Sequence, residues 1–169
     1  SPERIRNVAK RVAKWARAGH QMVVVPSAMS GETNRLLGLA KELAPERAMQ
    51  SYHRELDMLA ATGDPTRYTF PRPLLKGVAH ADRFAFSFSG LKTAVLRAVQ
   101  QCSDLDADRA HLARGFQDAA IEVMVAKTVA AAKEFGRELI VLGGGVACNR
   151  TLANALRRAT DGVAHVSVA

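Results

Sequence analysis

The chain has 169 residues, of which 48% are hydrophobic and 24% are charged. This composition excludes a disordered chain and suffices for one domain with a core, or two small lobes. No run of about 18 apolar residues occurs, so no membrane span is expected. The two cysteines, Cys102 and Cys148, lie outside any metal-ligand spacing, which predicts a reduced, cytoplasmic setting.

The net charge is +8, and a basic chain can bind nucleic acid. The excess is shared equally between residues 1–63 and 64–169, and no basic block is interleaved with aromatic residues. We interpret most of this charge as a solvated face. Attraction to a polyanion is the second interpretation.

The N-terminal third predicts three helices and one short strand. Apolar residues recur at helical spacing over residues 5–15, and Gly19 suits the end of that helix. Met22–Val25 is a short β-branched run that predicts a buried parallel strand. Two further helices are predicted at residues 33–43 and 45–61.

The middle of the chain changes character. Residues 64–83 contain prolines and glycines that break regular structure. Three phenylalanines then alternate with small residues, and this period of two predicts a strand over residues 84–88. We expect this strand to pair with residues 68–70 as an antiparallel edge hairpin.

The remaining sequence predicts long helices and two strands. One helix is predicted over residues 89–101 and a longer one over residues 107–135, with Asp106 as its cap. The last elements are strands at 139–142 and 163–168, with a helix at 149–159 between them. The whole pattern predicts a three-layer α/β fold, with a mostly parallel sheet and helices on both faces. Exposed sheet edges favour self-association, so a homodimer is expected.

A glycine-rich turn is the first candidate site. Gly143, Gly144 and Gly145 follow a buried strand and precede a helix that begins near Asn149. Glycines allow close approach to the backbone, and the N–H groups and dipole of a helix start favour an anion. Asn149 offers a donor and an acceptor to a ribose or base. The same glycines also fit a tight turn that only lets the helix pack on the sheet, and spacing alone does not decide between these interpretations.

A second loop, at residues 27–34, also joins a predicted strand to a predicted helix. Its hydroxyl side chains, Ser30 among them, could bind phosphate. A serine or threonine in this position more often caps the following helix.

Residues 1 to about 63 resemble the N-terminal region of aspartate kinase, which has the amino-acid kinase fold. The matching stretches are Ser1–Ile5, Val23–Asn34, Arg54–Leu59 and Thr62–Gly63. The resemblance implies phosphorylation of the aspartate side chain by ATP. It places Ser30 in the active-site loop and Glu55 near the substrate amino group.

Residues from about 55 to 169 resemble the middle and later part of the tRNA adenosine threonylcarbamoyltransferase family, which has an actin-like ATPase fold. The matching motifs are Gly63–Thr66, Phe70–Pro73, Phe86–Thr93, Phe116–Ala119 and Gly144–Arg150. The resemblance implies transfer of a threonylcarbamoyl group from its adenylate to a tRNA adenosine. It implies ATP or AMP with Mg²⁺ as ligands, and it places Asn149 and its glycines at the nucleotide.

Each resemblance lacks part of its family's catalytic set. The opening Lys-Phe-Gly-Gly-Thr-Ser segment of the kinases is absent, and Ala61 and Asp64 replace their usual Ser and Glu. The paired metal-binding histidines of the transferases are absent too, and their later metal-binding Asp would lie beyond Ala169. We therefore predict no intact metal site and no catalytic residue.

Two segments are expected, 1–63 and 64–169, separate or merged into one domain. The leading hypothesis is an incomplete nucleotide-binding segment of the transferase type. The alternatives are a recombined or designed scaffold without catalytic function, and an aspartate kinase fragment.

Overall fold

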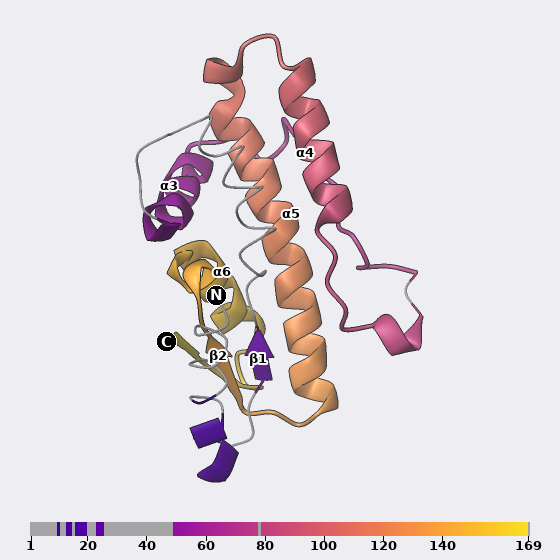
Figure 1. Cartoon of the computed structure of the whole chain (residues 1–169), viewed down its shortest axis with the longest axis vertical. Coiled ribbons are helices and arrows are strands. Elements are labelled where there is room, and N and C mark those ends of the chain that lie inside the picture. The colour runs from indigo at the N-terminus through magenta and orange to yellow at the C-terminus, as the bar shows by residue number, and fades with distance from the viewer. Residues whose placement is uncertain are drawn as a thin grey trace.

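The structure is a computed structural model that describes residues 10, 13–14, 16–19, 23–25, 49–77 and 79–168. Its elements are β1 (Val23–Val25), α3 (Met49–Ala61), the short 3₁₀ helix η1 (His80–Asp82), α4 (Ser89–Gln101), α5 (Leu105–Glu134), β2 (Leu139–Leu142), the 3₁₀ helix η2 (Gly145–Cys148), α6 (Arg150–Ala159) and β3 (His165–Val168). Helix α5 runs the length of the molecule beside α4, and it contacts α3 and α6 as well (Figure 1). The helix predicted at residues 33–43 and most of the one at 5–15 lie outside the described residues.

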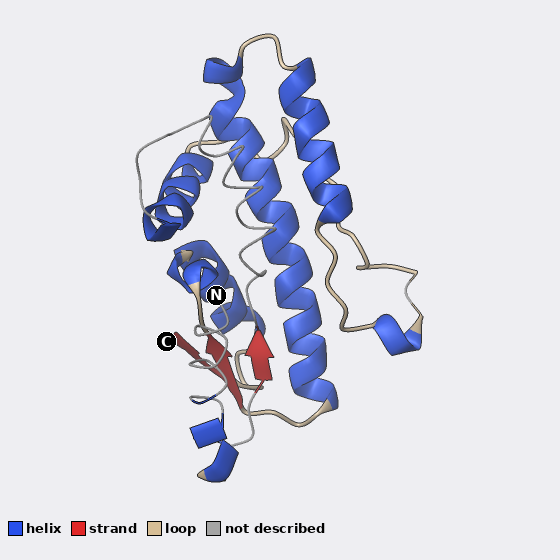
Figure 2. Ribbon diagram, viewed as in Figure 1, coloured by secondary structure: helices blue, strands red, loops and turns tan. Residues whose placement is uncertain are grey.

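The three strands form one parallel sheet in the order β1-β2-β3. Val141 of the central strand stands opposite Val24 of β1 and Ser167 of β3. The sheet lies beside the C-terminal half of α5 (Figure 2). An α/β fold with a parallel sheet is therefore confirmed, and strands from residues 1–63 and from residues 64–169 share that sheet.

One face of the sheet forms the main hydrophobic core. Buried side chains alternate along β2, as expected for a strand with one fully covered face, and β3 adds the buried Val166. Helices α5 and α6 cover this face. The core consists of Ile121, Ala132, Ile140, Leu142, Ala147, Leu152, Ala153, Leu156 and Val166.

A second core lies where the N-terminal half of α5 packs against α4. Its buried members are Phe70, Leu91, Leu112 and Ala119. Asp104, not the expected Asp106, caps α5 by accepting a hydrogen bond from the Ala107 N–H at 3.0 Å. Asp106 instead pairs with Arg109 at 2.7 Å. Within the described residues, no helix combines the length and apolar character needed to cross a membrane.

The strand expected over residues 84–88 is wrong, and so is the antiparallel edge hairpin, because this segment is irregular and pairs with no strand among the described residues. Its rings find partners on helices. Phe84 packs against Phe135 at the end of α5, with ring centroids 5.5 Å apart, and Phe88 joins the α4–α5 core. The Lys127 ammonium also donates to the Arg83 carbonyl at 2.8 Å. These contacts hold the segment along α5 rather than in a sheet.

Candidate functional site

The glycine-rich turn lies at the carboxyl end of β2, the central strand. In parallel α/β sheets, ligands usually bind outside the carboxyl ends of the strands. Gly144 has φ +83° and ψ −172°, a conformation that an L side chain rarely adopts. Its carbonyl accepts from the Ala147 N–H at 3.1 Å and so closes the turn into η2. The expected glycine turn between the strand and the following helices is therefore present, and its role toward an anion stays a prediction.

Asn149 is buried, with 5% of its surface exposed. Its Oδ1 accepts from the Leu152 N–H at 2.8 Å, which caps α6. Its Nδ2 donates to Gln117 Oε1 at 2.9 Å. Both ends of the amide thus have partners inside the protein, so a ligand would meet only the second hydrogen of Nδ2 or the second lone pair of Oδ1. In this structure Asn149 holds the turn in shape.

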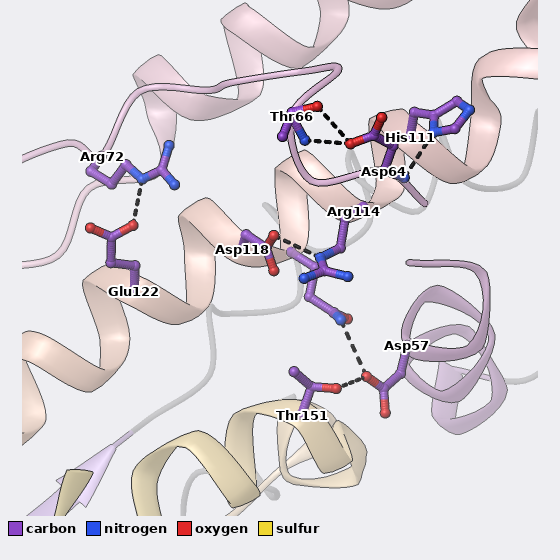
Figure 3. Close-up of polar contacts among 10 residues, drawn as sticks. Asp57, Asp64, Thr66, Arg72, His111, Arg114, Asp118, Glu122 and Thr151 are labelled. Carbon is purple, nitrogen blue, oxygen red and sulfur yellow. Dashed lines mark hydrogen bonds and ion pairs between the residues drawn. The ribbon is translucent and has the colours of Figure 1, made fainter. Parts of the chain in front are cut away.

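A polar network continues from Asn149 to α3. Gln117 Nε2 donates to Asp57 Oδ1 at 3.2 Å, and the Thr151 hydroxyl donates to the same carboxylate oxygen. Figure 3 shows Asp57 of α3 facing Thr151 of α6. The network therefore joins α3, α5 and the start of α6 around the glycine turn. The sequence marked Gln117 only as part of a motif, and it pointed to Glu55 rather than Asp57.

Of the two residues expected near the substrate, Glu55 and Ser30, the structure describes only Glu55. Glu55 is half-buried on α3, two positions before Asp57. Two positions correspond to about 200° around a helix, so Glu55 and Asp57 point to different sides. Ser30 lies outside the described residues.

The segment that follows α3 is pinned to α5 by backbone and side-chain contacts. The Asp64 N–H donates to His111 Nδ1 at 2.9 Å, and the Asp64 carboxylate accepts from the N–H and hydroxyl of Thr66 (Figure 3). The hydrogen bond from the Thr66 N–H holds the pKa of Asp64 below its ordinary value. Further along, Arg72 pairs with Glu122 at 2.7 Å. These contacts therefore fix the path of residues 64–72 along α5.

A buried acid, Asp108, lies near the start of α5. Its Oδ2 accepts from the Tyr68 hydroxyl at 2.6 Å and from the Cys102 thiol at 3.4 Å, while Arg67 lies 2.6 Å from Oδ1. The Tyr68 hydrogen bond, with help from Cys102 and Arg67, lowers the pKa of Asp108 despite its burial. The same hydrogen bond, together with burial, raises the pKa of Tyr68 to about 12.

This cluster predicts a late tyrosine ionisation and a pH-dependent stability. A pKa raised by folding stabilises the protein while the group is protonated, so the Tyr68 contribution is present below its unfolded pKa of about 10 and is lost as the pH rises through about 12. Asp108 has the opposite sign: its contribution is lost as the pH falls below the ordinary carboxyl range. The pKa of Tyr68 is measured by tyrosinate absorbance during an alkaline titration. Asp108→Asn should lower the pKa of Tyr68 toward its ordinary value. Asp106→Asn, which removes an exposed ion pair, should leave the pKa of Tyr68 unchanged.

The assignment of the ionisation near pH 12 to Tyr68 can be tested directly. Tyr68→Phe should abolish this late phase of the alkaline titration, and the ionisation of the other tyrosine in the chain should remain. A late phase that survives in Tyr68→Phe would disprove the assignment.

Within the described residues, no group of three or more His, Cys, Asp or Glu side chains is arranged to hold a metal ion.

Comparison with known proteins settles the family. The sequence profile of the family described as tRNA N6-adenosine threonylcarbamoyltransferase matches residues 9–168. The chain belongs to this threonylcarbamoyltransferase family. The match begins well before residue 63, so it runs across the expected boundary between the two segments.

Curated members of the threonylcarbamoyltransferase family align with a large part of the chain. The protein from Gemmatimonas aurantiaca is 46% identical over 118 residues, which cover 64% of this chain and 33% of the relative. The protein from Ralstonia pickettii is 42% identical over 130 residues, or 74% of this chain and 34% of the relative. The protein from Herminiimonas arsenicoxydans is 44% identical over 106 residues. The chain thus spans about a third of the length of these relatives.

Proposed function

We propose that the chain is a nucleotide-binding segment of the threonylcarbamoyltransferase type that lacks a complete catalytic set. The carrying observation is the positive-φ turn at Gly144, placed at the carboxyl end of the central strand and held by the buried Asn149. Such a turn brings backbone N–H groups toward a ligand without side chains in the way. Gly143 and Gly145 flank it, and an added Cβ at Gly143 would meet no atom within 4 Å.

The proposed ligand is an adenine nucleotide, ATP or AMP, with Mg²⁺ carried on its phosphates. The turn meets such a ligand from one side only, so binding is weak, in about the millimolar range. Attraction between the basic chain and the phosphates makes this binding sensitive to salt.

Calorimetric titration with ATP and AMP in the presence of Mg²⁺ tests this proposal. We expect heat of binding at millimolar ligand, and a several-fold loss of affinity in Gln117→Met. Methionine keeps the length of the side chain but removes the hydrogen bond that orients Asn149, at a stability cost of about 1 kcal/mol. Gln101→Met, at an exposed position of α4, is the matched control.

Two results would count against the proposal. Absence of heat at millimolar nucleotide in the unaltered chain refutes nucleotide binding. The scaffold alternative then gains support, and it requires that added nucleotide leave the melting temperature unchanged. Equal nucleotide affinity in Gln117→Met and Gln101→Met would show that the network does not shape the site.

The tRNA partner is part of the same proposal, because the name of the family includes tRNA and the chain is basic. A gel-shift assay with tRNA at two salt concentrations tests it. A complex held by phosphate contacts must weaken as salt rises. A complex insensitive to salt, or no complex, would remove tRNA from the proposal.

The finer expectations each have a separate test. Light scattering decides whether the chain forms a homodimer, and localisation in cells decides whether it is cytoplasmic. The aspartate kinase resemblance of residues 1–63 draws no support from the comparisons. Formation of aspartyl phosphate in a coupled assay would support the aspartate kinase interpretation. The same result would also support a division of the chain into 1–63 and 64–169.

A further inference from the structure

A depression of about 360 Å³ lies between η2, α6 and the end of β3. Its lining residues are Ala147, Arg150, Ala153, Asn154, Arg157 and Val168. Ala147 belongs to η2 and Val168 ends β3, so the depression lies at the same carboxyl edge of the sheet as the turn. This is the edge at which α/β sheets usually receive ligands.

One face of α6 supplies the polar lining of this depression. Arg150, Asn154 and Arg157 follow the spacing i, i+4, i+7, which places their side chains along one stripe of the helix. The buried Ala153 lies between them and keeps the floor shallow and apolar. Arg157 lies 3.4 Å from the Asn154 side-chain oxygen, so the two side chains lean toward each other.

The charges of this stripe are uncompensated. Five arginines elsewhere in the described chain pair with carboxylates: Arg67, Arg72, Arg83, Arg109 and Arg114. Neither Arg150 nor Arg157 pairs with an acid within the described residues, and no Asp or Glu lines the depression. Two guanidinium groups therefore line one depression that contains no acid. Guanidinium groups bind phosphate through paired N–H donors, so this arrangement suits a phosphate.

We propose that Arg150 and Arg157, with Asn154, form a phosphate subsite beside the glycine turn that receives the phosphates of a bound nucleotide. This inference rests on the proposed nucleotide function for the identity of the ligand. The arginines of α6 then add charged donors to the backbone N–H groups that the turn offers to the phosphates. The subsite therefore predicts tighter binding of a phosphorylated ligand than of a bare nucleoside.

The neighbouring Arg158 provides a control for the change in net charge. It is exposed, lies on the same last turn of α6 and carries the same charge as Arg157, but it does not line the depression. Arg157→Gln and Arg158→Gln therefore change the net charge of the chain equally. Only Arg157→Gln removes a proposed phosphate contact. Both positions are solvent-exposed, so neither variant is expected to disturb the fold.

The experiment titrates ATP, adenosine and inorganic pyrophosphate into the unaltered chain, Arg150→Gln, Arg157→Gln and Arg158→Gln. We expect Arg150→Gln and Arg157→Gln each to weaken ATP and pyrophosphate binding by about tenfold, as the loss of one hydrogen bond to a charged group does. Arg158→Gln should change either affinity by less than about twofold. Adenosine binding should be equal in the unaltered chain and in Arg157→Gln.

The possible results separate this subsite from the nucleotide proposal. If ATP binds and the three variants bind it equally, the subsite is refuted and the glycine-turn proposal stands. In another outcome, ATP does not bind, while pyrophosphate binds to the unaltered chain and to Arg158→Gln. If pyrophosphate binding is then lost in both Arg150→Gln and Arg157→Gln, the subsite stands and the nucleotide proposal fails. An RNA oligonucleotide is titrated in the same way. If Arg157→Gln weakens binding of the RNA but of neither ATP nor pyrophosphate, the assignment of the subsite to a nucleotide is overturned. Absence of heat with every ligand refutes both.

Discussion

Gly115→Ala is expected to lower the free energy of unfolding by about 1–3 kcal/mol. Gly115 lies within α5, where alanine normally favours the helix by about 1 kcal/mol. Here an added Cβ would collide with the carbonyl oxygen of Tyr68 and lie 3.2 Å from two ring carbons of Phe70. A backbone carbonyl cannot swing aside, so the segment carrying Tyr68 and Phe70 would have to lift from the helix.

The collision has a matched control in the neighbouring helix. Gly90 lies near the start of α4, and an added Cβ there would meet nothing closer than Pro73 Cγ at 3.9 Å. Gly90→Ala should therefore raise the free energy of unfolding by about 0.5–1 kcal/mol. Urea unfolding followed by circular dichroism measures both variants. Effects of the same sign would contradict the close approach of the Tyr68–Phe70 segment to α5.

Leu156→Ala is expected to lower the free energy of unfolding by about 2–5 kcal/mol. Leu156 belongs to α6 and is 1% exposed in the core that joins the sheet to α5 and α6. Its truncation removes apolar contacts and leaves a cavity that packed neighbours such as Ile140 cannot fill. Because Ile140 of β2 and Val166 of β3 belong to the same core as Leu156, the loss should also raise the exchange rate of amide hydrogens in β2 and β3.

An exposed apolar residue tests whether this cost comes from burial. Met58 lies on α3 with 73% of its surface exposed, and methionine and leucine have similar helix propensities. Met58→Ala should change stability by no more than about 0.5 kcal/mol. Comparable losses in the two variants would show that Leu156 is not part of the tightly packed core.

Elements with strong local signals were predictable from the sequence. The strand at Leu139–Leu142, the helix ending at Ala159 and the helix at Ser89–Gln101 occur where the pattern placed them. Asn149 marks the start of α6 by capping it, and the glycines that follow Leu142 mark the end of β2.

Elements that depend on distant partners were less predictable. The alternation over residues 84–88 predicts a strand, yet Phe84 and Phe88 pack against α5 and α4, and no strand among the described residues pairs with this segment. The sequence placed the cap of α5 at Asp106, but the extended backbone of Asp104 lets that carboxylate reach the Ala107 N–H instead. Both candidates were acids near the helix start, so composition alone could not choose between them.

The glycine-rich turn illustrates the division between sequence and structure. Its position after a buried strand, and the need for glycine at Gly144, follow from local backbone chemistry and are visible in the sequence. The role of Asn149 is not local, because its partner Gln117 is 32 positions away, and Gln117 reaches Asp57 across a further 60. A hydrogen bond between distant residues exists only once helices pack at a particular distance and rotation. The sequence by itself therefore determined the turn, while only the tertiary structure decided which side chains hold it and which arginines of α6 face the hollow beside it.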